Sequence, residues 1–270
     1  MPQDIDHPGC IGVYDSGVGG VSVLRALRVA LPHESFVYVA DSGYAPYGDQ
    51  PTDFVEARAR TVAGFLTDRG VKAMVLACNT VSVVAARHLR SQHPLPIIAM
   101  EPAIKPAVTA SRSGVVLVLG TTNTLRSESV GRLCERYASQ ARIVLSACPG
   151  LVECVERGEI DTPGLRSHLA EYLSPGLEAG ADTIVLGCTH YAFLAAVIAD
   201  LAGPAVSIIE PSAAIARQLA RRLGEMQEPA AKLAAQRTIF YTSGDPGALR
   251  SFLTAVREPC KAIRALPPLA

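Results

Sequence analysis

Short apolar runs alternate with longer amphipathic stretches along most of this 270-residue chain. The apolar residues within the runs are continuous rather than alternating, which is typical of strands covered on both faces, as in parallel sheets. The expected strands are residues 9–14, 35–40, 73–77, 96–100, 115–119, 143–146, 183–187, 205–209 and 237–241. Their alternation with helical stretches predicts an α/β fold with mainly parallel strands.

Two of the intervening stretches carry clear helical signals. Residues 54–68 follow a capping box formed by Asp53 and Glu56, and their apolar face consists of Val55, Ala59, Val62 and Leu66. Residues 165–177 repeat a leucine at every fourth position. We expect Pro175 to break or kink the last turn of this second helix, because proline lacks a backbone N–H.

The chain contains an internal repeat. Residues 70–80 read GVKAMVLACNT and residues 180–190 read GADTIVLGCTH, so in each copy a cysteine stands eight residues after a helix-ending glycine. A later strand ends in Glu-Pro 23 residues after Cys78 and 22 residues after Cys188. Self-similarity at a fixed offset indicates repeated structural units. Each half therefore has the order helix, strand, Cys, helix, strand, Glu-Pro.

The two Glu-Pro pairs mark the limits that we predict for these units. We expect one α/β domain made of residues 1–100 together with 211–270, and a second α/β domain over residues 101–210. The repeat predicts that the two domains are related by a pseudo-twofold axis. Each would be a mainly parallel sheet flanked by helices, with the active site in the cleft between them.

The last sixty residues do not repeat this pattern. They predict a helix over 213–224, a polar linker around 226–236, one strand, a last helix and an irregular tail from Glu258 onward. One strand and two helices cannot bury a core alone. We therefore expect this segment to pack against the first unit.

Composition and charge narrow the class of protein. Lys plus Arg balance Asp plus Glu at 25 each, which gives no sign of a nucleic-acid partner. No apolar run approaches the roughly 20 residues that span a bilayer. The first ten residues, MPQDIDHPGC, lack the basic and apolar regions of a signal peptide. We expect a cytoplasmic protein without a membrane partner.

An odd number of cysteines argues against a disulfide framework. No CxxC pair occurs, and Cys188 with His190 is the only local pairing of metal-binding residue types, so no metal is expected. Most cysteines should be small buried hydrophobes. The seven are Cys10, Cys78, Cys134, Cys148, Cys154, Cys188 and Cys260.

Four polar loops follow the expected strands, at the sheet edges where open α/β folds bind ligands. Their hydroxyls, amide and glycines, with backbone N–H groups at helix N-termini, suit the binding of carboxylates. None of them is a phosphate loop of the Walker A or GxGxxG type, so a nucleotide is not indicated. The loops are residues 14–20, 78–80, 120–124 and 188–190.

The duplicated cysteines predict paired acid–base chemistry. A thiol at a helix N-terminus is expected to have a lowered pKa and to exist partly as thiolate. Inversion of a stereocentre needs a base on one face of a carbon and an acid on the other. Cys78 and Cys188 could fill these roles in an amino-acid racemase. Two other interpretations stay open from the residues alone, a redox disulfide and simple packing.

Five motifs resemble the glutamate racemase family. They are VYDSGVGG at 13–20, APYG at 45–48, LACNT at 76–80, GTTNT at 120–124 and LGCTHY at 186–191. The resemblance extends from about residue 11 to the TSGD segment at 242–245. It implies a cofactor-independent isomerase that converts L-glutamate to D-glutamate for peptidoglycan synthesis, and it implies a homodimer.

The resemblance also implies roles for individual residues. Cys78 would act on the α-proton of D-glutamate and Cys188 on that of L-glutamate. Asp15 would support Cys78, and His190 would support Cys188. The substrate would be held by Asp15, Ser16, Tyr47, Gly48, Asn79, Thr80, Thr121, Thr124, Thr189 and His190.

The family carries a functional acid after a Cys-Pro segment, which here is residues 148–149. Glu156 fits that position, although Glu153 stands nearby where the family more often has proline. Two further departures are Ala192, where the family has proline, and Val130, where it usually has tyrosine. Both lie outside the cysteine and substrate loops.

Two alternatives remain for the activity. The first is a related racemase of aspartate or a hydantoin, which would use the same pair of thiols. The second is a non-catalytic protein that binds a dicarboxylate. No motif indicates a pyridoxal site, so no cofactor is expected.

Overall fold

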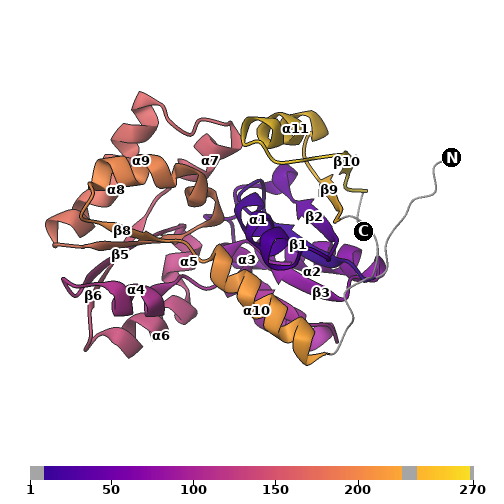
Figure 1. Cartoon of the computed structure of the whole chain (residues 1–270), viewed down its shortest axis with the longest axis horizontal. Helices are drawn as coiled ribbons and strands as arrows, with labels where there is room; N and C mark the ends of the chain where they lie inside the picture. The colour runs from indigo at the N-terminus through magenta and orange to yellow at the C-terminus, as the bar shows by residue number, and fades with distance from the viewer. Residues whose placement is uncertain (1–8, 227–235, 268–270) are drawn as a thin grey trace.

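The computed structural model describes residues 9–226 and 236–267, which form two parallel sheets flanked by helices (Figure 1). The six-stranded sheet has the order β10-β9-β2-β1-β3-β4, and the four-stranded sheet has the order β6-β5-β7-β8. All neighbouring strands in both sheets run parallel. The predicted α/β class with parallel strands is confirmed.

Apart from β10, the strands lie within one or two residues of the expected runs. Those of the first sheet are β1 (Ile11–Asp15), β2 (Phe36–Ala40), β3 (Ala73–Leu76), β4 (Ile97–Ala99), β9 (Thr238–Thr242) and β10 (Ala262–Ala265). Those of the second sheet are β5 (Val115–Gly120), β6 (Arg142–Ala147), β7 (Thr183–Gly187) and β8 (Ser207–Ile209).

The prediction of an irregular tail from Glu258 onward was wrong. Residues Ala262–Ala265 form β10, which pairs in parallel with β9 at the edge of the first sheet. This strand is four residues long, is only partly buried and includes Arg264, so it lacks the continuous apolar run that marks a central strand. β9 itself pairs with β2, which joins the C-terminal segment to the first sheet.

Helices cover both faces of the first sheet. α1 and α10 pack on one face, where Ile11 and Val13 of β1 share a core with Leu24 and Leu219. α2 and α3 pack on the other face, where Tyr14 is buried. The bounds are α1 (Val21–Ala30), α2 (Thr52–Asp68), α3 (Asn79–Gln92), α10 (Ser212–Glu225) and α11 (Pro246–Ala255), with a 3-10 turn, η1 (Ser42–Tyr44), after β2.

The second sheet is also covered on both faces, with α8 and α9 on one side and α4 and α6 on the other (Figure 1). Leu117 and Leu119 of β5 share a core with α8, whereas Val116 and Val118 between them pack against α4 and α6. The helices are α4 (Ile104–Ala110), α5 (Thr122–Arg126), α6 (Glu128–Tyr137), α7 (Leu151–Glu156), α8 (Pro163–Glu178), the 3-10 helix η2 (Thr189–Leu194) and α9 (Ala195–Ala202).

Two local predictions about helix ends fail in part: the capping box before residues 54–68 does not form, and the helix does not break at Pro175. α2 begins at Thr52 after Pro51, and no side chain caps it, because the helix starts ahead of the proposed Asp53 cap. α8 continues past Pro175 to Glu178. Proline removes one backbone hydrogen bond near the end of this helix. Leu177, in the last turn, is partly buried and packs against the core that α8 shares with the second sheet.

Both sheets share one topology. The order β2-β1-β3-β4 in the first corresponds to β6-β5-β7-β8 in the second. Gly70 and Gly180 follow α2 and α8 with φ angles of +68° and +86°, a conformation that favours glycine. β3 and β7 then lead to Cys78 and Cys188 at equivalent strand ends. The exact domain limits stay a prediction.

The part of the chain that the structure describes holds no helix both long and apolar enough to cross a bilayer. The first eight residues and most of the predicted linker around 226–236 lie outside the described residues.

Candidate active site

Cys78 and Cys188 line one pocket at the carboxyl ends of β3 and β7. Each residue directly precedes a helix, α3 or η2, and each is buried. The pocket is narrow, with a free volume of about 10 Å³, which is room for about one water molecule. The residues around it are Ser16, Tyr47, Gly48, Cys78, Asn79, Thr80, Thr121, Val152, Cys188, Thr189 and His190.

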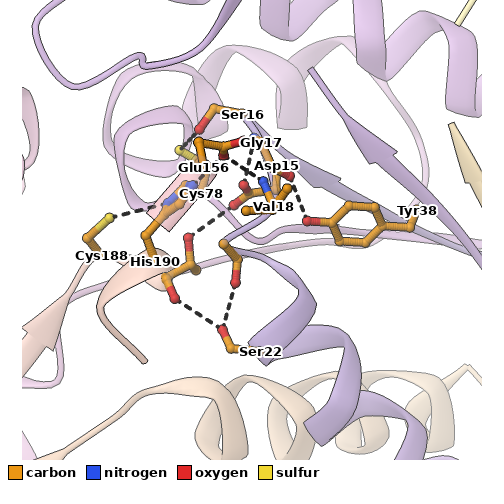
Figure 2. Close-up of polar contacts among 12 residues, drawn as sticks. Asp15, Ser16, Gly17, Val18, Ser22, Tyr38, Cys78, Glu156, Cys188 and His190 are labelled. Carbon is orange, nitrogen blue, oxygen red and sulfur yellow. Dashed lines mark hydrogen bonds and ion pairs between the residues drawn. The ribbon is translucent and has the colours of Figure 1, made fainter. Parts of the chain in front are cut away.

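The surroundings of Cys78 keep its thiol protonated. Burial raises the pKa of Cys78 to about 11, and the charge of Asp15 acts in the same direction, while a hydrogen bond with Ser16 opposes them. The Ser16 Oγ lies 3.4 Å from the Cys78 sulfur (Figure 2). The expected lowering of the Cys78 pKa was therefore wrong. Burial destabilises the thiolate by more than the helix N-terminus stabilises it.

Asp15 lies behind the pocket wall rather than in it. One of its carboxylate oxygens accepts the backbone N–H of Gly17 at 2.8 Å, and the other accepts the hydroxyl of Thr189 at 3.1 Å. Burial raises the pKa of Asp15, partly offset by the charge of His190. Asp15 thus links the loop beside Cys78 to the loop beside Cys188.

The second thiol has a different partner. The Cys188 sulfur lies 3.7 Å from Nδ1 of His190, and Nε2 of His190 lies 2.6 Å from Oε1 of Glu156 (Figure 2). Burial lowers the pKa of His190, but the interactions with Cys188 and Glu156 outweigh it and raise the pKa well above its usual value. An imidazolium beside a thiol stabilises the thiolate. The two halves therefore place their cysteines in unlike environments.

Glu156, rather than Glu153, contacts His190. The same Oε1 atom also accepts the backbone N–H of Val18 at 2.8 Å, so it joins α7 to the glycine-rich loop after β1. The close approach needs glycine, because a Cβ on Gly17 would lie 1.8 Å from Oε1 of Glu156. A Cβ on Gly19 would similarly lie 2.4 Å from Nδ1 of His190.

Hydroxyl groups from both halves meet beside the thiols. The Thr80 and Thr121 hydroxyls lie 2.9 Å apart, and Thr121 donates to Thr124 at 2.9 Å, which places Thr124 behind the pocket wall. The side chain of Asn79 is buried, and its two amide atoms have no hydrogen-bonding partner among the described residues. Unpaired buried amides are costly, so this one is suited to bind a polar ligand.

Comparisons with known proteins identify the family. The model of the Asp/Glu/Hydantoin racemase family matches residues 21–219. This chain belongs to that family. It is 48% identical over 95% of its length to the glutamate racemase of Pseudomonas entomophila, covering 97% of that protein. The protein is therefore an isomerase.

Solved structures agree with this assignment. A glutamate racemase isoform, RacE1 of Bacillus anthracis, superimposes with a TM-score of 0.88 at 27% identity, covering 98% of this chain and 100% of that one. The Escherichia coli glutamate racemase, solved with L-glutamate and an activator, gives a TM-score of 0.85 at 28% identity, with coverage of 96% and 98%.

Neither of the two residues that depart from the family pattern lines the pocket. Val130 is buried in α6 with Ile104 and Leu125, in the core between α4 and the second sheet. Ala192 is half-buried in η2.

In the described part of the chain, no group of three His, Cys, Asp or Glu side chains is arranged to hold a metal ion.

The hydroxyl of Tyr47 is engaged within the first half. It is hydrogen-bonded to Asp41 and lies 3.1 Å from the Tyr14 hydroxyl. Arg58 in turn binds Asp41 through two contacts of 2.8 Å. Tyr47 lines the pocket with its remaining atoms.

Sequence reasoning missed several residues around the pocket. Asp41 follows β2, so the rule that ligands bind at strand ends could have found it. Arg58 and Val152 carry no such signal, whereas Asn123 lies in the predicted loop at 120–124, where only the threonines were expected to bind the substrate. Arg58 lies on a helix face that only the fold brings to Asp41, and Val152 is one of many buried aliphatic residues.

Proposed function

We propose that this racemase interconverts L-glutamate and D-glutamate without a cofactor, with Cys78 and Cys188 acting on opposite faces of the α-carbon. One observation carries this proposal: both thiols line a single small pocket, each at the end of an equivalent strand. Glutamate as substrate is supported by the relatives, which are glutamate racemases at 46–50% identity.

The different environments of the two thiols support L-glutamate as the enantiomer that the free protein converts first. Cys188, beside the His190 imidazolium, acts as the thiolate that removes the α-proton of L-glutamate. Cys78, held neutral by burial, gives its proton to the opposite face and becomes a thiolate. The product is D-glutamate, and the reverse reaction uses the same two groups in exchanged roles. The number of protons is conserved, because Cys188 takes one proton from the α-carbon and Cys78 gives one proton to the same carbon.

The chain's polar groups favour the carbanion that forms between these steps. Asn79 presents both donor and acceptor atoms without a protein partner, and Ser16, Thr121 and Thr189 add hydroxyls at the pocket wall. Preorganised donors that bind the carboxylate as charge develops stabilise such a transition state more than water does. We assign these residues to the substrate carboxylates and amine, with Gly48 shaping the wall.

Racemisation in D₂O tests the proposal directly. The protein is incubated with L-glutamate and without pyridoxal phosphate, while circular dichroism follows the loss of optical activity and proton NMR follows deuterium at the α-carbon. We expect both signals, and we expect Cys78→Ala and Cys188→Ala each to abolish racemisation. Retained turnover in either variant would exclude the two-thiol reaction.

The same assay separates the alternatives. Faster loss of optical activity with L-aspartate would assign the pocket to the shorter dicarboxylate, and a parallel assay with a hydantoin tests the remaining family substrate. Glutamate binding by calorimetry without exchange of the α-proton would indicate a binding protein. The expected result is turnover of glutamate alone.

We also propose that the product supplies D-glutamate for peptidoglycan synthesis in the cytoplasm and that the protein works as a homodimer. Expression of the chain should rescue a bacterial strain that requires D-glutamate, whereas the Cys78→Ala variant should not. Light scattering on the purified protein should give a mass of about twice the 28.4 kDa of one chain. A mass of one chain would contradict the dimer.

A further inference from the structure

A single side chain joins the two halves on the wall of the pocket. Asn123 belongs to α5 in the second half, and its amide nitrogen donates to the backbone carbonyls of Tyr47 at 3.2 Å and Gln50 at 2.8 Å. Its backbone N–H also donates to the carbonyl of Gly48 at 3.0 Å. One residue of the second half therefore binds three backbone carbonyls, those of residues 47, 48 and 50, in one loop of the first half.

The two loops that Asn123 joins form part of the pocket itself. Tyr47 and Gly48 line it from the first half, and Thr121 lines it from the second. A Cβ on Gly48 would lie 2.9 Å from the Cβ of Thr121, so the loops already touch. The position of this wall relative to the thiols therefore depends on contacts between residues 47–50 and 121–124.

The remaining polar contacts between the halves serve other segments. Val18 binds Glu156, Asp15 binds Thr189, and Ser22 donates to the carbonyl of Thr189 at 3.4 Å (Figure 2). These contacts hold the loop after β1 against the thiol loops. The hydroxyl contacts of Thr80 join the start of α3 to residues 121–124. Asn123 is the described residue whose side chain binds the loop at residues 47–50 across the cleft.

We propose that Asn123 is a positioning residue that holds the loop at residues 47–50 against the second half and so keeps the pocket closed around the substrate. The amide suits this task because it presents two N–H donors to two carbonyl oxygens. Its oxygen is not needed for the contact. The inference deepens the proposed racemisation, on which its kinetic test rests.

The isosteric variant Asn123→Asp gives the sharpest test. It keeps the shape of the side chain but replaces the donors with carboxylate oxygens that face two carbonyl oxygens, so it should open the loop. Asn123→Ala removes the donors without adding repulsion, and its effect should be smaller. Thr122→Ala is the matched control, because it changes the neighbouring residue of α5 without removing a donor to the loop at residues 47–50.

Kinetics should separate positioning from chemistry. Loss of the two hydrogen bonds should raise KM about tenfold or more in Asn123→Asp, with kcat changed less than about threefold, because substrate binding must now close the loop. The equilibrium constant between enantiomers is 1, so kcat/KM must fall equally for L-glutamate and D-glutamate. Thr122→Ala should match the wild type. Unchanged KM in Asn123→Asp would overturn the proposal.

Alkylation of the thiols provides a readout that does not depend on turnover. Iodoacetamide followed by peptide mass spectrometry measures the modification rate of each cysteine. We expect Cys78 and Cys188 to react about tenfold faster in Asn123→Asp than in the wild type, because an opened loop exposes them. Cys10, which is buried before β1 at the opposite end of the strand, should keep its rate.

The two readouts distinguish the ways in which the ideas could fail. Equal acceleration at Cys10 would mean that Asn123 maintains the fold as a whole, which overturns a positioning role. If Asn123→Asp fails to fold, the Asn123→Ala variant carries the same comparison. If the wild-type protein does not racemise glutamate, the proposed function fails, while the alkylation rates still decide whether Asn123 closes the pocket.

Discussion

Glu156 uses one carboxylate oxygen to bind both Nε2 of His190 at 2.6 Å and the backbone N–H of Val18 at 2.8 Å. The first contact raises the pKa of the imidazole beside Cys188, and the second fixes the loop that carries Ser16 towards Cys78. A single carboxylate therefore influences both thiols, through charge on one side and through loop position on the other.

Replacement of Glu156 by Gln should separate charge from shape. The pKa of His190 should fall, because burial lowers it and one of the two opposing interactions is weakened. Less imidazolium then leaves a weaker counter-charge beside the Cys188 sulfur, and kcat/KM at neutral pH should fall about tenfold for each unit by which the pKa of His190 drops below the assay pH. NMR titration of the imidazole and racemisation rates give the two values.

Glu153→Gln is the control for this substitution, because Glu153 lies on the same helix without contacting His190. It should leave both the titration of His190 and the rates unchanged. An equal loss of activity in both variants would argue that the net charge of α7, rather than the contact with His190, controls the reaction.

The buried thiol of Cys78 should make stability depend on alkaline pH. Its pKa is raised from 9.0 to about 11, so between these values the folded protein keeps a proton that the unfolded chain releases. The contribution is fully present below pH 9 and is lost as the pH rises to 11, by about 3 kcal/mol in the free energy of unfolding.

Urea denaturation at pH 8, 9.5 and 10.5 measures this loss. Tyrosines and lysines titrate in the same range, so the useful quantity is the difference between the wild type and Cys78→Ser. The wild type should lose more stability than the variant over this interval. Parallel curves would show that burial of the thiol does not control its ionisation.

The glycine at position 17 should be indispensable. In Gly17→Ala the new methyl carbon would lie 1.8 Å from Oε1 of Glu156, so the carboxylate must leave Val18 and His190. We expect activity to fall by at least as much as in Glu156→Gln, together with a lower melting temperature.

Gly64→Ala is the matched control, because a Cβ at this helical position meets no atom within 4 Å. It should stabilise the protein by about 0.5–1 kcal/mol, since alanine favours the helix of α2. If Gly17→Ala were equally active and stable, the described contact between Glu156 and the loop would not control the site.

The ion pair behind Tyr47 should contribute strongly to stability. Asp41 is fully buried, so Arg58→Met leaves a carboxylate without its counter-charge at a cost of about 3–5 kcal/mol. The double variant Asp41→Asn with Arg58→Met should recover most of this loss, because no unpaired charge remains. Additive losses in a double-mutant cycle would contradict the coupling.

The parts of the site that lie in local sequence motifs could be predicted from the sequence. Cys78 and Cys188 stand out because the same segment occurs twice, and strand ends of parallel sheets converge on a common edge. The pKa of Cys78 could not be predicted in the same way. Its position before α3 is visible in the sequence, whereas its burial beside Asp15 depends on the pairing of β1 with β3 and on the packing around them.

The fold shows the same division. Continuous apolar runs found the central strands, but β10 was missed because an edge strand with an arginine has no such run. Arg58 reaches Asp41 only after α2 packs beside β2, and Asn123 reaches the loop at residues 47–50 only after the halves meet. Contacts of this kind leave no pattern in neighbouring residues.

The proposed reaction leaves the free enzyme in a protonation state that depends on which enantiomer it last converted. Conversion of L-glutamate leaves Cys188 protonated and Cys78 ionised, so the free protein then favours the D-enantiomer until protons redistribute between the sulfurs. At high substrate concentration this return step would limit turnover. A tracer experiment measures this return step. An equilibrium mixture of radiolabelled L- and D-glutamate is added to the protein together with an excess of one unlabelled enantiomer. While the unlabelled enantiomer reacts, the labelled mixture should move away from its equilibrium ratio, because the protein is mostly in the form that binds the other enantiomer.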